Sequence, residues 1–276
     1  MNTPRPAALS ASSSREYLQC PLKYRYSQVD RLPQPPTVAT IRGTLVHAVL
    51  ERLFDLEPVE RSWDQASALL APQWERLSQK NPNYQPVIER DSSVADLFAE
   101  SNNLLGTYFA LENPQYLAPA ARESFVEARL PSGLLLRGIV DRIDAAPDGR
   151  LRVVDYKTGK SPAARFVDEA LFQMRFYVLL LQATGRSPAR LQLLYLKDGR
   201  VLTLDPVPED IARFEHELQV IWNRIHADAT AGTFAPKQTP LCNWCPFHSG
   251  CPLFGGQVPE AKQEDLDRIL AIGPRA

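Results

Sequence analysis

The sequence predicts an α/β fold in which a mixed β-sheet is flanked by helices, with a helical N-terminal region and a cysteine cluster near the C-terminus. Three observations predict it. Apolar residues recur at helical spacing through roughly the first 115 residues, and their period then shortens to two over five segments. A helical pattern at 167–184 separates the third of these segments from the fourth, as a crossover helix would. Three of the four cysteines fall within residues 242–251.

Each expected element has its own signal. Serines that can cap a helix begin residues 10–26, where apolar side chains repeat every four positions, and a proline-rich turn at 32–36 follows. Helical periodicity marks further segments at 40–56, 63–79, 92–112 and 208–229, and Gly185 closes the helix at 167–184. Strands are expected at 124–130, 134–145, 151–156, 189–197 and 200–204, with turns of Pro-Ser-Gly at 131–133, Pro-Asp-Gly at 147–149 and Lys-Asp-Gly at 197–199.

The composition is that of a globular protein, with 44% hydrophobic and 23% charged residues, which excludes general disorder. The longest uncharged apolar stretch, 176–183, is far shorter than the ~20 residues of a membrane span, and residues 1–14 lack the apolar block of a signal peptide. We therefore expect a cytoplasmic protein with no membrane partner. Lys and Arg outnumber Asp and Glu by 7 to 3 in residues 1–54 and by 8 to 6 in 137–180. These segments would suit a polyanion, although chance clustering explains the counts equally well.

One predicted hairpin places two carboxylates together. The Pro-Asp-Gly sequence at 147–149 suits a three-residue loop that pairs residue 146 with residue 150. In that register Asp141 faces Asp155, and Lys157 lies on the same face as Asp155. Two close carboxylates repel unless a cation lies between them, and oxygen ligands favour Mg²⁺ or Mn²⁺. The adjacent lysine would orient or help to deprotonate a water. The alternative is a surface hairpin whose aspartates face solvent.

Four short motifs, in order along the chain, resemble those of a known family. Gly138-Ile139-Val140-Asp141 followed by Asp155-Tyr156-Lys157 resembles the PD-(D/E)XK nuclease signature. The segments 43–47, which ends in His47, and 173–177, Gln173 to Tyr177, fall where the RecB-type branch of that superfamily carries further motifs. The resemblance covers residues 9–256 and implies a restriction-endonuclease-like sheet.

The resemblance also implies a role for each matching residue. His47, Asp141, Asp155 and the carbonyl of Tyr156 would bind the metal ion. Asp141, Asp155 and Lys157 would be catalytic, and Gln173 with Tyr177 would contact DNA and position the site. Taken alone, His47 on an amphipathic helix also suits a packed or surface residue, and Gln173 and Tyr177 suit a half-buried helix face. Glu127 is a weaker candidate for a position next to the metal ligands, since solvent exposure explains it as well.

The cysteines favour a metal centre over a disulfide in a reducing compartment. One cysteine precedes the predicted nuclease core and three follow it, a layout that resembles the iron–sulfur centres of AddB-type and CRISPR-associated RecB-like nucleases. This resemblance implies a structural [4Fe–4S] cluster on Cys20, Cys242, Cys245 and Cys251. Zinc is the alternative, although four-thiolate zinc sites more often show two Cys-x2-Cys pairs.

We expect one RecB-like nuclease domain over residues 1–256, followed by a polar C-terminal tail at 257–276 with a short helix at 260–272. The domain would comprise N-terminal helices with the first cysteine (1–57), a helical insertion (58–120), the nuclease core (121–230) and a cysteine loop (231–256).

The expected function is that of a metal-dependent DNA nuclease in DNA repair or recombination, acting as an exonuclease on single strands. No phosphate-binding Gly-x4-Gly-Lys-Ser/Thr loop occurs in the chain, so any helicase motor would be a separate subunit. A set of basic and aromatic residues could track a strand by charge and stacking, or could belong to a solvated helix: Arg15, Lys23, Arg25 and Arg42 with Tyr17, Tyr24 and Tyr26. Two alternatives have no catalysis: a DNA-binding or scaffold protein of the same fold, and a structural zinc protein.

Overall fold

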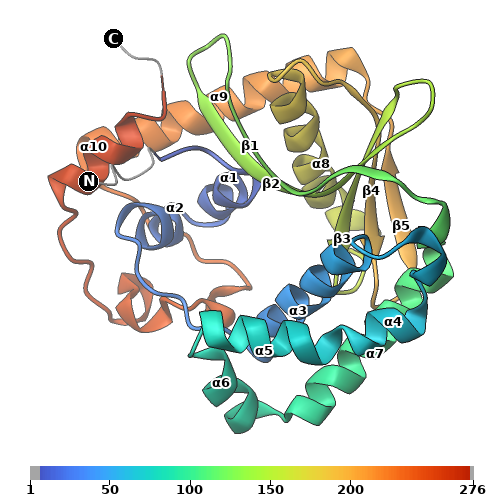
Figure 1. Cartoon of the computed structure of the whole chain (residues 1–276). Coiled ribbons are helices and arrows are strands. Elements are labelled where there is room, and N and C mark those ends of the chain that lie inside the picture. The colour runs from blue at the N-terminus through green and yellow to red at the C-terminus, as the bar shows by residue number, and fades with distance from the viewer. Residues whose placement is uncertain (1–6, 274–276) are drawn as a thin grey trace, which may run out of the picture.

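The computed structural model describes residues 7–273 and contains one mixed five-stranded sheet (Figure 1). Its strands lie in sequence order: β1 (Pro119–Arg129), β2 (Leu135–Ala145), β3 (Leu151–Lys157), β4 (Pro188–Tyr195) and β5 (Arg200–Leu204). β3 and β4 are parallel, because α8 (Val167–Gln182) crosses between them, and the other neighbours are antiparallel. The α/β fold class expected from the sequence is therefore confirmed.

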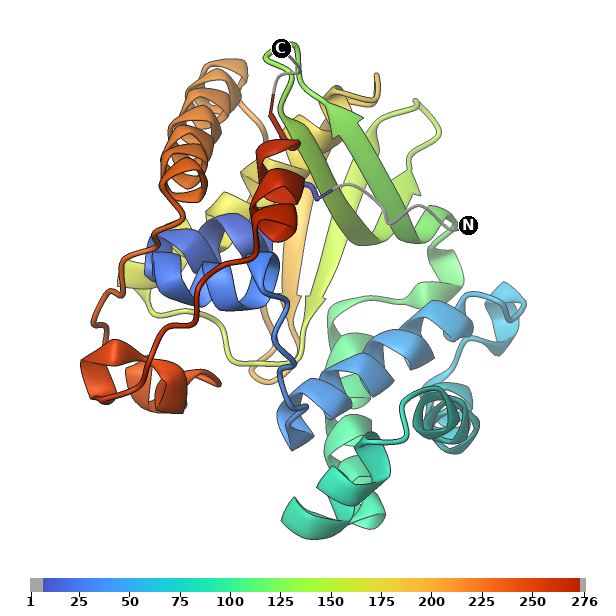
Figure 2. The ribbon, with the colours of Figure 1, turned by 90° about the vertical axis from the view of Figure 1, so that its left-hand side faces the viewer.

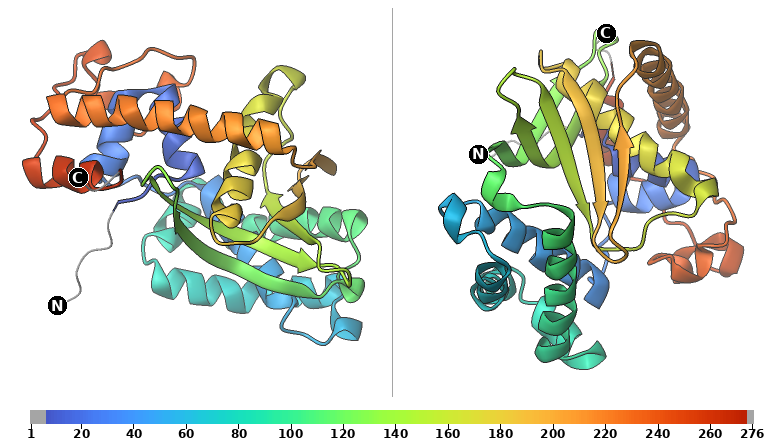
Figure 3. Two further views of the ribbon diagram at one scale, coloured as in Figure 1. Left: turned by 90° about the horizontal axis from the view of Figure 1, so that it is seen from above. Right: turned by 90° about the vertical axis from the view of Figure 1, so that its right-hand side faces the viewer.

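Helices cover both faces of the sheet and enclose two apolar cores (Figures 2 and 3). On one face α8 packs with α1 (Ala11–Gln19), α9 (Pro208–Ala231) and α10 (Gln263–Leu270). On the other face α3 (Val38–Leu53) packs with the helices of the insertion. Side chains of β3 point alternately to the two faces of the sheet, so Val153 packs in the first core and Val154 and Tyr156 pack in the second.

The helical insertion contains four α-helices: α4 (Trp63–Ala68), α5 (Leu70–Lys80), α6 (Tyr84–Asp91) and α7 (Val94–Leu111). The sequence predicted one helix over 63–79, whereas the structure has two helices that are divided at Leu69. The sequence did not predict α6. Both differences arise in short helices, where periodicity extends over too few turns to mark the ends.

The N-terminal helix expected over residues 10–26 is interrupted at Cys20, which has an extended backbone with φ −162° and ψ 112°. Pro21 has no N–H to donate and begins a new helix, α2 (Pro21–Tyr24), followed by a π-helical turn at Arg25–Val29. The extended backbone at Cys20 therefore separates α1 from α2.

The proposed strand-tracking role of this first segment is wrong. Its three tyrosines are buried and cannot stack on bases: Tyr17, Tyr24 and Tyr26. Its basic residues already have acidic partners: Arg15 with Glu169, Lys23 with Glu16, Arg25 with Asp30 and Arg42 with Glu100. The pairs with Glu169 and Glu100 hold the N-terminal segment to α8 and α7, and the other two are internal to the segment.

The C-terminal segment is part of the packed domain and not an appendage. Leu266, Ile269 and Ile272 are buried in the core beneath α9, and the Leu135 N–H donates to the Ile272 carbonyl oxygen at 2.8 Å. Apolar residues spaced three apart give this short helix one buried side. Within the described residues, no helix combines the length and the apolar character needed to cross a membrane.

Candidate active site

The β2–β3 hairpin has the register expected from its turn. The Ala146 N–H donates to the Arg150 carbonyl oxygen at 2.9 Å, and Arg142 lies opposite Val154. The next pair in that register would be Asp141 and Asp155, but here the two strands separate. The Tyr156 N–H donates to Oδ2 of Asp141 at 2.8 Å, so a side chain replaces the backbone acceptor. The strands therefore open where the two aspartates lie.

Asp155 is nearly enclosed, with 3% of its surface exposed, and is held by side chains from β3 and α8. Lys157 Nζ lies 2.7 Å from Asp155 Oδ2, and Gln173 Nε2 donates to Asp155 Oδ1 at 2.7 Å. Lys157 Nζ also donates to Gln173 Oε1 at 2.7 Å. Gln173 therefore bridges the lysine and the carboxylate. Tyr177, one helical turn later, donates its hydroxyl to the Ile139 carbonyl oxygen at 2.8 Å and fixes α8 against β2.

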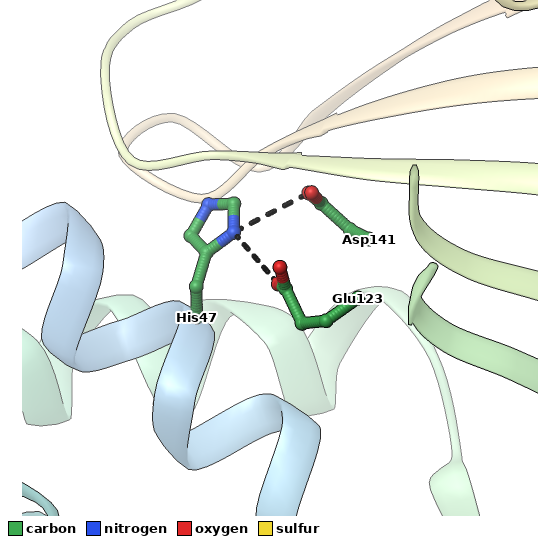
Figure 4. A group of neighbouring side chains, drawn as sticks. All are labelled: His47, Glu123 and Asp141. Atoms are coloured by element: carbon green, nitrogen blue, oxygen red, sulfur yellow. Dashed lines mark ion pairs between the residues drawn. The ribbon is translucent and has the colours of Figure 1, made fainter. Parts of the chain in front are cut away.

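His47 reaches the same place from α3 (Figure 4). Its Nε2 lies 3.0 Å from the Tyr156 carbonyl oxygen, and its Nδ1 lies 3.4 Å from Asp141 Oδ2 and 3.7 Å from Glu123 Oε1. Both ring nitrogens face acceptors, which favours the doubly protonated ring. Burial lowers the pKa of His47, but the contact with Glu123 and the charges of Asp141 and Asp155 outweigh burial and raise the pKa to about 9. A protonated imidazole thus supplies positive charge between the carboxylates.

The pKa of Asp141 is also shifted. Burial raises it first, the negative charge of Asp155 raises it further, and the pKa reaches about 7 despite the opposing effect of His47. Burial and a second acid therefore both disfavour the ionised form of Asp141. This charge pattern is typical of a site that binds a cation.

The third acid of this cluster is Glu123, which the sequence analysis did not identify. His47, Glu123 and Asp141 each offer one ligand atom, and the three atoms lie within 4.8 Å of one another. The register of β1 and β2 could have identified Glu123. The loop at 131–133 pairs Leu130 with Leu134, and counting back an equal number of residues along both strands places residue 123 opposite Asp141.

Glu123 has φ 42°, in the left-handed region that costs a non-glycine residue ~1–3 kcal/mol. The ladder of β1 and β2 is regular on both sides of it, with Arg122 opposite Arg142 and Ser124 opposite Val140. Glu127, suggested as a neighbour of the metal ligands, instead pairs with Arg137 across the strands, with Nε donating at 2.8 Å. That suggestion is wrong, because the cross-strand partner accounts for the charge of Glu127.

Two motif glycines permit close approaches around the site. A Cβ at Gly43 would lie 3.2 Å from Thr158 Oγ1, so glycine lets α3 approach the turn after Lys157. A Cβ at Gly138 would lie 3.1 Å from Leu180 Cδ2 and 3.3 Å from Tyr177 Cε1, so glycine lets β2 approach α8. Both contacts are tighter than ordinary packing and explain why these positions lack a side chain.

A groove of about 770 Å³ opens beside the site, and we call it the α3 groove. It lies along α3 and extends from the acidic cluster to the helical insertion. Residues on its walls include Thr40, Arg42, Thr44, His47, Lys80 and Glu123.

The four cysteines come from both ends of the chain, and Cys20 packs in one small cluster with residues of the C-terminal loop. Leu22, Tyr26 and Phe247 form a small buried core against which three of the cysteines pack: Cys20, Cys245 and Cys251. Backbone N–H groups point at the sulfurs. The N–H of Lys237 lies 3.4 Å from Cys20 Sγ, and the N–H of Thr239 lies 3.3 Å from Cys242 Sγ. The charges of Cys20 and Cys242 also act on Cys245, whose pKa is raised mainly by burial.

The sequence resembles known nucleases along most of its length. The sequence model of the PD-(D/E)XK nuclease superfamily matches residues 8–252. Gene 69 protein of Mycobacterium phage D29 is 26% identical over 273 residues, which cover 89% of this chain and 96% of that protein.

Two further similarities are more limited. An ATP-dependent helicase/deoxyribonuclease subunit of Streptococcus equi subsp. zooepidemicus is 27% identical over 211 residues, or 73% of this chain but 19% of that protein. A crystal structure from Eubacterium rectale, described as that of an exonuclease, superposes with a TM-score of 0.55. It is 13% identical, and the match covers 86% of each chain, so this likeness shows the fold alone.

Proposed function

Because the chain belongs to the PD-(D/E)XK nuclease superfamily, we propose that it is a metal-dependent DNA nuclease that digests single strands from an end. The observation that carries this proposal is the convergence of Asp141, Asp155 and Lys157 at the point where β2 and β3 separate. The shared superfamily accounts for a nuclease in general, while the single-strand preference and the exonuclease mode are proposals of ours.

The donor atoms fit a divalent cation. Asp141, Asp155 and the Tyr156 carbonyl offer oxygens, and His47 offers one imidazole nitrogen beside them. Oxygen-rich sites favour Mg²⁺ or Mn²⁺, and the imidazole suits Mn²⁺ as well. Burial first and the charge of Asp155 second raise the pKa of Asp141 to about 7, and a bound cation would favour the ionised form of this carboxyl. A bound ion would lower the pKa of a water ligand and polarise the scissile phosphate. We propose Glu123 as an additional acid that orients His47 or the ion's water.

The chain's own side chains then have distinct roles. Lys157 brings an ammonium group beside Asp155 and can neutralise charge that develops on the phosphoryl oxygens during water attack. Gln173 holds this ammonium and Asp155 at fixed positions by accepting from the first and donating to the second. Tyr177 maintains the distance between α8 and β2. Catalysis in this proposal is carried by Asp141, Asp155 and Lys157, and Gln173 and Tyr177 position them.

We also propose that Cys20, Cys242, Cys245 and Cys251 bind a structural [4Fe–4S] cluster. Supporting this, backbone N–H groups aim at Cys20 and Cys242, as is usual for thiolates of such clusters. Zinc held by four thiolates is the alternative, although such sites more often use two Cys-x2-Cys pairs than the single pair at Cys242 and Cys245.

The proposed partner is a separate helicase subunit, and the proposed context is DNA repair or recombination. The relative from Streptococcus equi is named a helicase/deoxyribonuclease subunit, and this chain matches 19% of it. The chain itself carries no Gly-x4-Gly-Lys-Ser/Thr loop. A nuclease unit without a motor would depend on another polypeptide to unwind duplex DNA.

The test is cleavage of 5′- and 3′-labelled single strands by protein purified without oxygen, in Mg²⁺ or Mn²⁺. We expect metal-dependent shortening from one end, lost in Asp155→Ala and Lys157→Ala. Asp148→Ala is the matched control, since Asp148 is an exposed acid at the turn of the same hairpin, and its ion pair among the described residues is with Arg150. Cleavage by the Asp155 and Lys157 variants at the parent's rate would refute the assigned site. A colourless protein that contains stoichiometric zinc would refute the cluster.

A further inference from the structure

The α3 groove connects the candidate metal site to the helical insertion. His47 and Glu123 line it together with Lys80, the last residue of α5. We propose that this groove holds the backbone of the substrate strand next to the scissile phosphate, and that Lys80 binds a phosphate of that strand. The inference rests on the proposed nuclease function and gives the helical insertion a part in substrate binding.

Packing fixes where Lys80 lies. Leu70 and Trp74 of α5 are buried in the same apolar core as Ile41 and Leu45 of α3. α5 is therefore held against the helix that carries His47. Because Lys80 is the last residue of α5, a helix that packs against α3 holds its backbone at the wall of the groove.

The charge of Lys80 is available to a ligand. Within the described residues Lys80 has neither an ion pair nor a hydrogen bond to its ammonium group, whereas Arg42, the other long basic side chain of the groove, pairs with Glu100. Of the groove's acids, Glu51 contacts Arg52, and Glu123 faces His47. Lys80 is thus the cation of this groove that an incoming anion can meet without breaking an existing pair.

The helical insertion has a surplus of acidic residues, so Lys80 does not belong to a generally basic surface. Residues 58–120 contain four basic residues against eight acidic ones. Arg61 is buried and donates to backbone carbonyls, including that of Leu117 at 2.7 Å, and Arg90 pairs with Asp91. An anionic strand would avoid most of this acidic segment and is attracted where Lys80 faces the groove.

A purely structural role for Lys80 is the competing explanation. A cation in the last turn of a helix stabilises it through the helix dipole by ~0.3–1 kcal/mol. That role would appear in thermal stability and would leave strand binding unchanged. The two explanations therefore predict different measurements on the same variant.

The experiment compares Lys80→Gln, Lys80→Arg and Arg90→Gln in the full-length protein. Anisotropy of a fluorescein-labelled single strand is measured over a range of salt concentrations, and the kinetics of its cleavage are measured in Mn²⁺. For Lys80→Gln we expect the slope of log affinity against log salt to fall in magnitude by about 0.7–1, as for one lost phosphate contact. KM should rise several-fold while kcat stays within about twofold. Lys80→Arg should restore both values, and Arg90→Gln, which changes a paired charge elsewhere in the insertion, should match the parent.

An unchanged salt slope and KM in Lys80→Gln would overturn the inference, whether or not the melting temperature falls. Failure of the proposed function looks different. In that case the parent would not cleave in either metal, or Lys157→Ala would cleave as fast as the parent, whatever Lys80→Gln does to binding. The anisotropy measurement needs no catalysis, so it tests Lys80 in either case.

Discussion

The affinity of the site for Mn²⁺ should rise steeply with pH, because the ion must displace protons. His47 has a pKa raised to about 9 and Asp141 has a pKa raised to about 7. Metal ligands bind in their deprotonated forms, so a proton on either residue competes with the ion. Both residues carry a proton well below pH 7, His47 alone carries one between pH 7 and 9, and neither carries one above pH 9.

The size of the effect follows from these values. Each displaced proton changes the apparent affinity about tenfold per pH unit, or ~1.4 kcal/mol. Between pH 7 and 9 one proton leaves, so affinity should increase by roughly a hundredfold. Below pH 7 the slope should steepen towards two protons as Asp141 becomes protonated.

Isothermal titration calorimetry of Mn²⁺ binding between pH 6 and 9 provides the assay. Paired buffers with different ionisation enthalpies would also count the released protons. His47→Gln should leave at most one displaced proton at any pH, and the remaining inflection should move above pH 7, because the variant also loses the charge that lowers the pKa of Asp141. Glu123→Gln should shift the upper inflection of the parent to lower pH. His226→Gln, which changes an exposed histidine of α9, is the control. An affinity that varies less than twofold between pH 7 and 9 would refute the reasoning.

Three further predictions concern residues around the site. Gln173→Leu should lower kcat by ~10–100-fold, as is typical for residues that orient ligands, with little change in melting temperature; a rate near the parent's in stopped-flow cleavage would contradict this. Gly138→Ala adds a Cβ 3.1 Å from Leu180 Cδ2 and should lower the free energy of unfolding in urea by ~1–3 kcal/mol. An unchanged midpoint of the urea transition would show that α8 can move to make room. Arg142→Met removes one of the two arginines that pair with Glu112 and Asp144 among the described residues, and Arg152 remains. The free energy of unfolding should fall by an amount towards the lower end of ~3–5 kcal/mol. A more stable variant would mean that desolvation of the buried charges outweighs their attraction.

Much of the architecture could be predicted from local signals. Strand periodicity with Pro-Gly and Asp-Gly turns predicted five strands, and the loop at 147–149 correctly predicted the register of β2 and β3. The first helix was wrong because periodicity continued across Cys20 and Pro21, although a proline favours the first position of a new helix. The C-terminal segment was described as a tail because short apolar spacings do not reveal which surface they cover.

The part of the site that lies on one hairpin could be predicted from the sequence. The part where three strands and two helices meet was harder to predict. The register set by one turn predicts that Asp141 and Asp155 lie together. Placing Glu123 beside them needs the register of a second hairpin, β1–β2, and a left-handed backbone at Glu123 that the residue type does not indicate. The tyrosines of the first segment were misassigned for a related reason. An aromatic residue at helical spacing has the same pattern whether it packs inside or contacts a ligand, and only burial distinguishes the two.

The central claim is that Asp141 and Asp155 share one divalent ion beside Lys157. The measurement is anomalous scattering from crystals of the protein equilibrated with Mn²⁺ above pH 9, where His47 has lost most of its competing proton. We predict a single strong peak bounded by the carboxylates of Asp141 and Asp155 and the Tyr156 carbonyl oxygen, with Lys157 Nζ adjacent. Manganese bound elsewhere, with these two carboxylates still paired only to protein groups, would contradict the account.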